Sequence, residues 1–138
     1  MDHSRLDNLV RIGYLKQESA DESEIAGLIQ SGEVRLADAG NAELSLDSRF
    51  DLAYNAAHAV SLAALRRQGY RPENRYLVFQ CLEATLGLPV EQWRVLDDAH
   101  RRRNNAEYEG IIEIEETLVE AMIRVTAEAL KRLRDRSQ

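Results

Sequence analysis

Several residue types are scarce in this chain of 138 residues, and each scarcity excludes a class of protein. The single cysteine, Cys81, has no second cysteine in the chain with which to form a disulfide. Only 2 prolines and 7 glycines are present, which is too few for a β-rich protein with its many turns or for a low-complexity chain. No apolar run approaches the roughly 20 residues that cross a bilayer, and the first residues do not resemble a signal peptide. We therefore expect a cytoplasmic protein that makes no use of a membrane.

Positive charge is also in short supply. The 18 Lys and Arg residues are outnumbered by 24 Asp and Glu residues, so the formal net charge is -6. Because affinity for nucleic acid rises with the number of phosphates that the protein neutralises, a chain with this balance is not a general nucleic-acid binder. Any contact with nucleic acid has to come from a local basic patch.

Helix-forming residues are abundant instead, with 17 Ala and 18 Leu. Apolar residues recur at three- and four-residue steps, which predicts helices over residues 2–18, 22–42, 45–68, 74–86, 89–109 and 111–135. The sequence therefore predicts an all-α fold. We expect an antiparallel four-helix bundle over residues 45–138, forming one compact unit, preceded by an N-terminal helical hairpin over residues 1–44.

Three short signals mark the ends of the predicted helices. Asp21 followed by Glu24 resembles a capping box with Asp in place of Ser or Thr. Ser45 stands at the start of the Ala-rich helix, and Gly69 follows its end as a C-terminal cap glycine would.

The densest polar cluster runs from Arg101 to Gly110. Residues four apart on a helix share a face, so Asn104 lies beside Tyr108 and Arg103 lies beside Glu107. One interpretation is a solvated surface, in which Asp97 pairs with Arg101 and Asp98 pairs with Arg102. That interpretation explains Arg103 less well, because Arg103 continues the apolar stripe of Trp93 and Leu96. An arginine on such a stripe needs a partner or borders a cleft that receives an anion.

A second polar line crosses the Ala-rich helix at Asp51, Asn55 and His58. One interpretation is that these residues form a partly exposed face or hydrogen-bond to one another in the core. The other is that they line a polar cleft opposite the Arg103 cluster. In the latter case His58 is the proton carrier near neutral pH. His100 is a weaker candidate.

The sequence gives little support for a metal site, a phosphate-binding loop or a nucleophilic cysteine. Asp97 and His100 form one carboxylate–histidine pair on a single helix, whereas a di-metal site in a bundle needs several such groups from several helices. No Gly-rich phosphate loop is present. An apolar setting makes Cys81 a small buried hydrophobe instead of a nucleophile. We expect neither a metal nor a cofactor.

Two segments resemble the HEPN superfamily, a group of small helical bundles. They are the Ala-rich helix from Arg49 to Ala59 and the segment from Arg103 to Tyr108, and the resemblance covers roughly residues 45–135. It implies a four-helix core that forms a homodimer, with the Arg-containing motif of both chains in one cleft. In active members that cleft cuts RNA without a metal. Several members are toxins whose antitoxin is a nucleotidyltransferase or another protein.

The chain departs from the family pattern at Tyr108, where a His is expected. A phenol with a pKa near 10 is a poor general base at neutral pH, but it can donate a hydrogen bond to a phosphate oxygen. The candidate phosphate-binding residues are Arg102, Arg103, Asn104 and Tyr108. The candidate residues lining the cleft are Asp51, Asn55, His58 and Glu107, and the candidates for proton transfer are His58 and Tyr108.

Three functions are compatible with these features. The favoured one is a HEPN-like homodimer that acts as a nucleotide- or RNA-binding regulatory protein. It would be related to toxin–antitoxin or defence systems and would have no catalytic activity. The second is a metal-independent endoribonuclease toxin. The third is a structural module whose N-terminal hairpin docks a partner protein.

Overall fold

The chain folds mostly into helices, which confirms the expected helical class. The computed structural model describes residues 3–74, 77–110 and 113–136, with the backbone alone described at 107–109. The elements are α1 (Ser4–Arg11), β1 (Leu15–Gln17), α2 (Glu22–Ala39), α3 (Leu46–Arg67), β2 (Tyr70–Pro72), α4 (Leu77–Gln80), α5 (Leu82–Leu86), α6 (Val90–Glu109) and α7 (Glu116–Asp135). None of the helices in the described ranges has both the length and the apolar character that a bilayer crossing requires.

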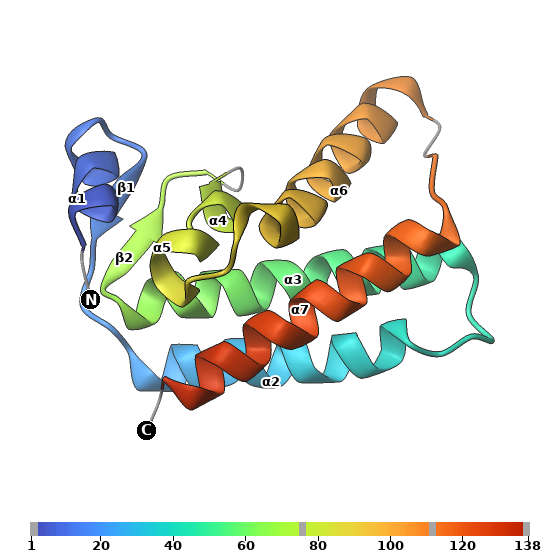
Figure 1. Ribbon diagram of the computed structural model, residues 1–138, viewed down its shortest axis with the longest axis horizontal. Helices are drawn as coiled ribbons and strands as arrows, with labels where there is room; N and C mark the ends of the chain where they lie inside the picture. Colours follow the sequence, from blue (N-terminus) through green and yellow to red (C-terminus); the bar gives the residue numbers. More distant parts are fainter. Residues whose placement is uncertain (1–2, 75–76, 111–112, 137–138) are drawn as a thin grey trace.

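Helix α3 forms the centre of the molecule (Figure 1). The long helices α2, α3, α6 and α7 alternate in chain direction, and α6 is inclined away from the layer formed by the other three (Figure 1). α3 contacts α2 and α7 along its length and also packs against α4, α5 and β2. Its small alanines, such as Ala53, Ala57 and Ala63, are almost fully buried, which lets neighbouring helices approach closely.

The approach of α2 to α3 depends on Gly32. A Cβ atom at this position would lie 2.8 Å from Val60 Cγ2 on α3, well inside van der Waals contact. Val60 is itself fully buried and β-branched, so its side chain has few alternative rotamers. The glycine that weakens α2 as an isolated helix is therefore the residue that lets it pack.

The first predicted helix is shorter than expected. α1 ends at Arg11, Gly13 has a φ of 88° in the left-handed region, and the chain continues as β1. β1 pairs antiparallel with β2, with Leu15 opposite Pro72 and Gln17 opposite Tyr70. The prediction of helix over residues 12–18 was wrong, because pairing with a distant segment outweighed the local pattern.

The predicted helix over residues 74–86 is also divided. It comprises α4 and α5 with a turn at Cys81, and its residues 75–76 lie outside the described ones. The Thr85 hydroxyl donates a hydrogen bond to the Cys81 carbonyl oxygen at 3.1 Å, a contact that typically bends a helix. The last predicted helix begins at Glu116 instead of residue 111, and residues 111–112 lie outside the described ones.

A buried arginine joins the N-terminal segment to α3. The Arg66 side chain is 1 % exposed. Its Nε donates to Glu24 Oε1 at 2.7 Å, and its Nη2 donates to the Ser19 carbonyl oxygen at 2.7 Å. Its Nη1 donates to the carbonyl oxygens of Glu18 at 2.9 Å and of Tyr70 at 3.2 Å. One guanidinium thus holds together α3, β2 and the connection from β1 to α2.

Arg71 on β2 extends this contact. It donates to Glu18 Oε2 at 2.6 Å and to Glu24 Oε2 at 2.8 Å. Hydrogen bonds from Arg66 and then Arg71 lower the pKa of Glu24 below its ordinary value. Asp21 caps α2 as predicted, but the Glu24 carboxylate binds the two arginines instead of completing a capping box. The division into residues 1–44 and 45–138 stays a prediction.

Replacing Gly32 by Ala is expected to lower the free energy of unfolding by about 1–3 kcal/mol, because the added methyl group displaces Val60 or the α3 backbone. Replacing Gly27 by Ala is the matched control, since that α2 glycine faces open space. It should raise the free energy of unfolding by up to about 1 kcal/mol through helix propensity. Urea unfolding followed by circular dichroism measures both. Changes of the same sign would contradict the close approach of α2 and α3.

Replacing Arg66 by Met is expected to cost about 3 kcal/mol or more of unfolding free energy, because it removes every donor that Arg66 supplies while keeping the aliphatic volume. The control is Arg101→Met. Arg101 is exposed and pairs with Asp98 at 3.3 Å, so its loss should cost less than about 1 kcal/mol. Guanidinium unfolding curves of the two variants provide the comparison. A cost for Arg66→Met no larger than for Arg101→Met would show that the buried network does not stabilise the fold.

Candidate anion site on helix α6

Arg103 lies on α6 and packs against α3. Its Cζ atom lies 4.5 Å from the centre of the Tyr54 ring, which is the geometry of a cation–π contact. Tyr54 is 1 % exposed, so the guanidinium covers a ring that belongs to the core. The contact fixes the plane of the guanidinium against a rigid side chain.

No carboxylate neutralises Arg103 among the described residues. Its Nη1 atom is buried and has no hydrogen-bond partner in the described part of the chain. The two preceding arginines differ, because Arg101 pairs with Asp98 at 3.3 Å and Arg102 pairs with Glu115 at 2.6 Å. Arg103 is therefore a cation held by an aromatic face, and its buried Nη1 has no acceptor among the described residues.

A hydrogen-bonded chain lies beside the guanidinium. The Tyr54 hydroxyl and His100 Nδ1 are 2.7 Å apart, and Asn104 Nδ2 lies 3.3 Å from His100 Nε2. The Tyr54 and His100 rings stack with their centres 6.0 Å apart. Tyr54, His100 and Asn104 thus form one array that orients the side chains next to Arg103.

The sequence brings His100 forward only as a weaker candidate for proton transfer, and it does not bring Tyr54 forward at all. His100 lies three residues before Arg103 and four before Asn104, so helical spacing places all three on one face of α6. That spacing could have identified His100. Nothing in the sequence indicates Tyr54, because its place beneath Arg103 depends on how α6 packs on α3.

His58 packs on Phe79, the ring that Tyr54 and His100 also contact. Its ring centre is 6.5 Å from that of Phe79, and it lines a hollow of about 260 Å³ beside β2 with Leu62, Arg71 and the next residues of the chain. Asp51 is exposed, and Asn55 Nδ2 donates to the Asp51 backbone carbonyl at 2.9 Å. Among the described contacts, Arg103 packs on the Tyr54 ring. Asn55 bonds to Asp51 on its own helix, and none of these contacts joins Asp51 or Asn55 to Arg103.

Arg102 is used within the chain. Its side chain pairs with Asp98 at 3.4 Å, as predicted, and it also donates to Glu115 at 2.6 Å and to the Glu113 carbonyl oxygen at 3.0 Å. These contacts tie α6 to the connection that leads into α7. The side chains of Glu107 and Tyr108 lie outside the described residues, and the roles predicted for them stay predictions.

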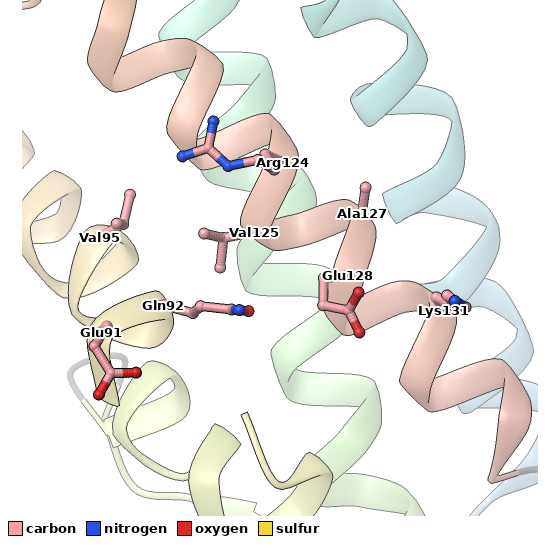
Figure 2. Close-up of a pocket in the computed structure, with 8 residues that line it drawn as sticks. All are labelled: Glu91, Gln92, Val95, Arg124, Val125, Ala127, Glu128 and Lys131. Atoms are coloured by element: carbon pink, nitrogen blue, oxygen red, sulfur yellow. The ribbon is translucent and has the colours of Figure 1, made fainter. Parts of the chain in front are cut away.

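A groove of about 470 Å³ separates the first part of α6 from α7 (Figure 2). Arg124 and Lys131 line it on α7, and Glu91 lines it on α6 (Figure 2). Glu128 lies between the two α7 cations in sequence and also pairs with Arg132 at 2.8 Å. Because both signs of charge alternate along this groove, it offers an anion less than the Arg103 site does.

The described residues contain no cluster of three or more His, Cys, Asp or Glu side chains that could hold a metal ion. No protein-family model matches the chain, and neither a curated protein nor a solved structure matches it. The geometry around Arg103 is thus the main guide to function.

Replacing Tyr54 by Phe is expected to lower the free energy of unfolding by about 1–2 kcal/mol, because it removes a buried hydrogen bond with His100 and keeps the ring under Arg103. Tyr14→Phe is the matched control, since Tyr14 is 48 % exposed and should tolerate the change within about 0.5 kcal/mol. Thermal unfolding with calorimetry tests both. An unchanged stability for Tyr54→Phe would show that the hydrogen bond between Tyr54 and His100 does not hold the array in place.

Proposed function

We propose that this protein is a HEPN-like homodimer that binds the phosphate of a nucleotide or RNA through Arg103 and Asn104. It acts as a binding and regulatory protein, in a toxin–antitoxin or defence setting, and does not cleave its ligand. A nucleotidyltransferase-type antitoxin is the partner that the HEPN resemblance suggests.

The observation that carries this proposal is the Arg103 guanidinium on the Tyr54 ring, which no carboxylate among the described residues neutralises. A guanidinium presents N–H donors in one plane, which matches two oxygens of a phosphate. Because the ring already holds Arg103, binding an anion costs less side-chain entropy than it would for a free surface arginine. Asn104 lies next to Arg103 in the chain, and its contact with His100 orients its amide at the same site.

The acidic net charge of -6 and the single arginine at the site predict how strongly binding depends on salt concentration. A site built on one arginine neutralises few phosphates, so affinity should depend only weakly on salt concentration. This favours a mononucleotide or a short single-stranded RNA over a long duplex. It also separates the proposal from a general nucleic-acid binder, which the composition excludes.

Burial of the nearest histidine supports binding without cleavage. A general base has to reach the proton that it removes, and His100 is 5 % exposed with Tyr54 and Asn104 at its two ring nitrogens. His58, the histidine favoured from sequence, lines the hollow beside β2. The endoribonuclease alternative therefore has no exposed histidine among the described contacts of Arg103.

The homodimer rests on the family resemblance and on the inclination of α6. The second half of α6, which carries Arg103, lies at the periphery of the molecule (Figure 1). A second copy could approach it without displacing α2, α3 or α7. Two Arg103 sites would then share one cleft, as the resemblance implies.

Replacing Arg103 by Met is expected to weaken binding of a fluorescein-labelled single-stranded RNA of about 12 nucleotides by at least about tenfold, because charge-assisted hydrogen bonds to phosphate are lost. Fluorescence anisotropy measures the affinity, and ATP serves as the competing mononucleotide. Arg101→Met is the matched control on the same helix, and its Asp98 pairing leaves it outside the site. Light scattering reports whether the protein is a dimer.

Equal affinity of the wild type and Arg103→Met would reject the proposed site. Cleavage of the labelled RNA by the wild type, lost in Arg103→Met, would favour the endoribonuclease alternative. A monomer that still binds through Arg103 would reject the shared cleft alone.

A further inference from the structure

Helix α6 carries several polar atoms that its packing leaves unsatisfied. Among the described residues, Gln92 Oε1, Trp93 Nε1 and Arg103 Nη1 have almost no exposed surface and no hydrogen-bond partner. Gln92 and Trp93 lie in the first turn of α6, and Arg103 lies about three turns later. A polar group in this state has lost its hydrogen bonds to water and has gained none within the protein. The packing of α6 is therefore penalised at both ends of the helix.

Few apolar side chains offset this penalty. Over residues 90–106, where the side chains of α6 are described, the buried residues are Leu96, Ala99 and His100. α7 buries seven residues over a helix of the same length. α2 buries as few as α6, but no atom of the unsatisfied kind is found on its described residues, and Glu24 binds it to Arg66. α6 is thus the long helix whose packing costs least to undo.

The chain just before α6 is held firmly to α7. Arg132 on α7 donates to the Gly87 carbonyl oxygen at 2.7 Å and to the Leu86 carbonyl oxygen at 3.3 Å. Leu88, the next residue, is fully buried. α6 then begins after Pro89, and its N-terminus has no side-chain cap. Because residues at the ends of helices absorb the backbone changes of hinge motions, Pro89 is the natural pivot for α6.

The far end of α6 is attached to a connection instead of to a helix. Arg102 donates to the Glu113 carbonyl oxygen and to the Glu115 carboxylate, and both residues precede the first residue of α7. These contacts do not fix α6 to the body of α7. The connection can therefore follow α6 when the helix moves.

Arg103 links such a movement to the candidate anion site. A ligand cannot bond to an atom that has no exposed surface, so a phosphate reaches Arg103 Nη1 only after the packing around this atom has opened. The Tyr54 ring against which the guanidinium packs belongs to another helix, α3. Separation of α6 from α3 removes this ring from the guanidinium.

We propose that α6 turns away from α3 as one unit about Pro89, and that a phosphate binds Arg103 in this open state. The opening follows from the packing of α6 alone. Its role in binding rests on the function proposed for Arg103. A ligand that binds only the open state has an apparent affinity that falls in proportion to the open fraction. A substitution that closes α6 by a given factor therefore weakens binding by the same factor.

Hydrogen–deuterium exchange of the full chain without ligand tests the opening. The amides in the middle of α6 are expected to exchange at similar opening-limited rates, at least about 100-fold faster than those in the middle of α3. Mass spectrometry of peptic peptides measures both sets of rates in one sample.

Gln92→Met tests the cause of the opening. Methionine keeps the length of the side chain and removes the buried amide, so exchange in α6 should slow by about 5- to 30-fold while exchange in α3 stays unchanged. Gln30→Met is the matched control, because Gln30 is exposed on α2 and should change neither rate.

The same two variants test the link to binding. Gln92 lies about 16 Å along the helix from Arg103, so it is too far away to contact a ligand there. With the labelled single-stranded RNA of about 12 nucleotides used above, Gln92→Met should weaken binding by the factor by which it slows exchange in α6. Gln30→Met should bind as the wild type does.

Each result has one consequence. Exchange in α6 as slow as in α3 would overturn the opening, and this comparison uses the wild type alone. Unchanged or faster exchange in a folded Gln92→Met would show that the unsatisfied atoms do not drive it. Slower exchange with unaltered RNA affinity would overturn the link to binding and leave the opening supported. No binding of RNA to the wild type would reject the function proposed for Arg103, while the exchange rates would still decide the opening.

Discussion

The buried guanidinium of Arg66 is the interaction on which the arrangement of this fold depends. Four hydrogen bonds from one side chain link the last turn of α3 to the segment before α2 and to β2. A guanidinium cannot lose its charge at physiological pH, so burying it requires acceptors on every side. The connection between β1 and α2 supplies two of them, the backbone carbonyls of Glu18 and Ser19, and the other two are the Glu24 carboxylate and the Tyr70 carbonyl. The path of the N-terminal segment is thus fixed by the hydrogen-bond acceptors that the buried Arg66 guanidinium requires.

α3 links this network to the candidate anion site. Arg66 lies in its last turn, Val60 meets Gly32 near its middle, and Tyr54 lies one to two turns earlier beneath Arg103. The same rigid helix therefore positions α2 on one side and the guanidinium of α6 on another. Two arginines show two ways of placing a cation in a protein interior. Arg66 is surrounded by oxygen acceptors and is structural, whereas Arg103 lies on an aromatic ring and its Nη1 has no acceptor in the described part of the chain.

Much of the helical pattern could be predicted from local signals. Asp21 and Ser45 cap helices as their residue types indicate, and Gly69 has the positive φ expected of a glycine that ends a helix. The same logic failed at β1, where a local apolar pattern continued past Gly13 although the backbone turned there. At the candidate site, the apolar stripe on which Arg103 lies distinguished it from Arg101 and Arg102. A charged side chain among apolar positions needs a partner or a cleft, so this position was informative. For Arg102 the pairing with Asp98 was predicted from local spacing, whereas its second partner, Glu115, lies between α6 and α7 and is not indicated by any local spacing.

The amino-acid sequence by itself determined the helical class, the capped N-termini of α2 and α3 and the choice of Arg103 as the unusual cation, because these depend on residues within a few turns of one another. The tertiary structure alone decided that Tyr54 lies beneath that cation with its hydroxyl bonded to His100, and that β1 pairs with β2. Each of these requires segments distant in the chain to meet. Which segments meet is decided by the packing of whole helices and by buried groups such as Arg66, and no local spacing encodes that.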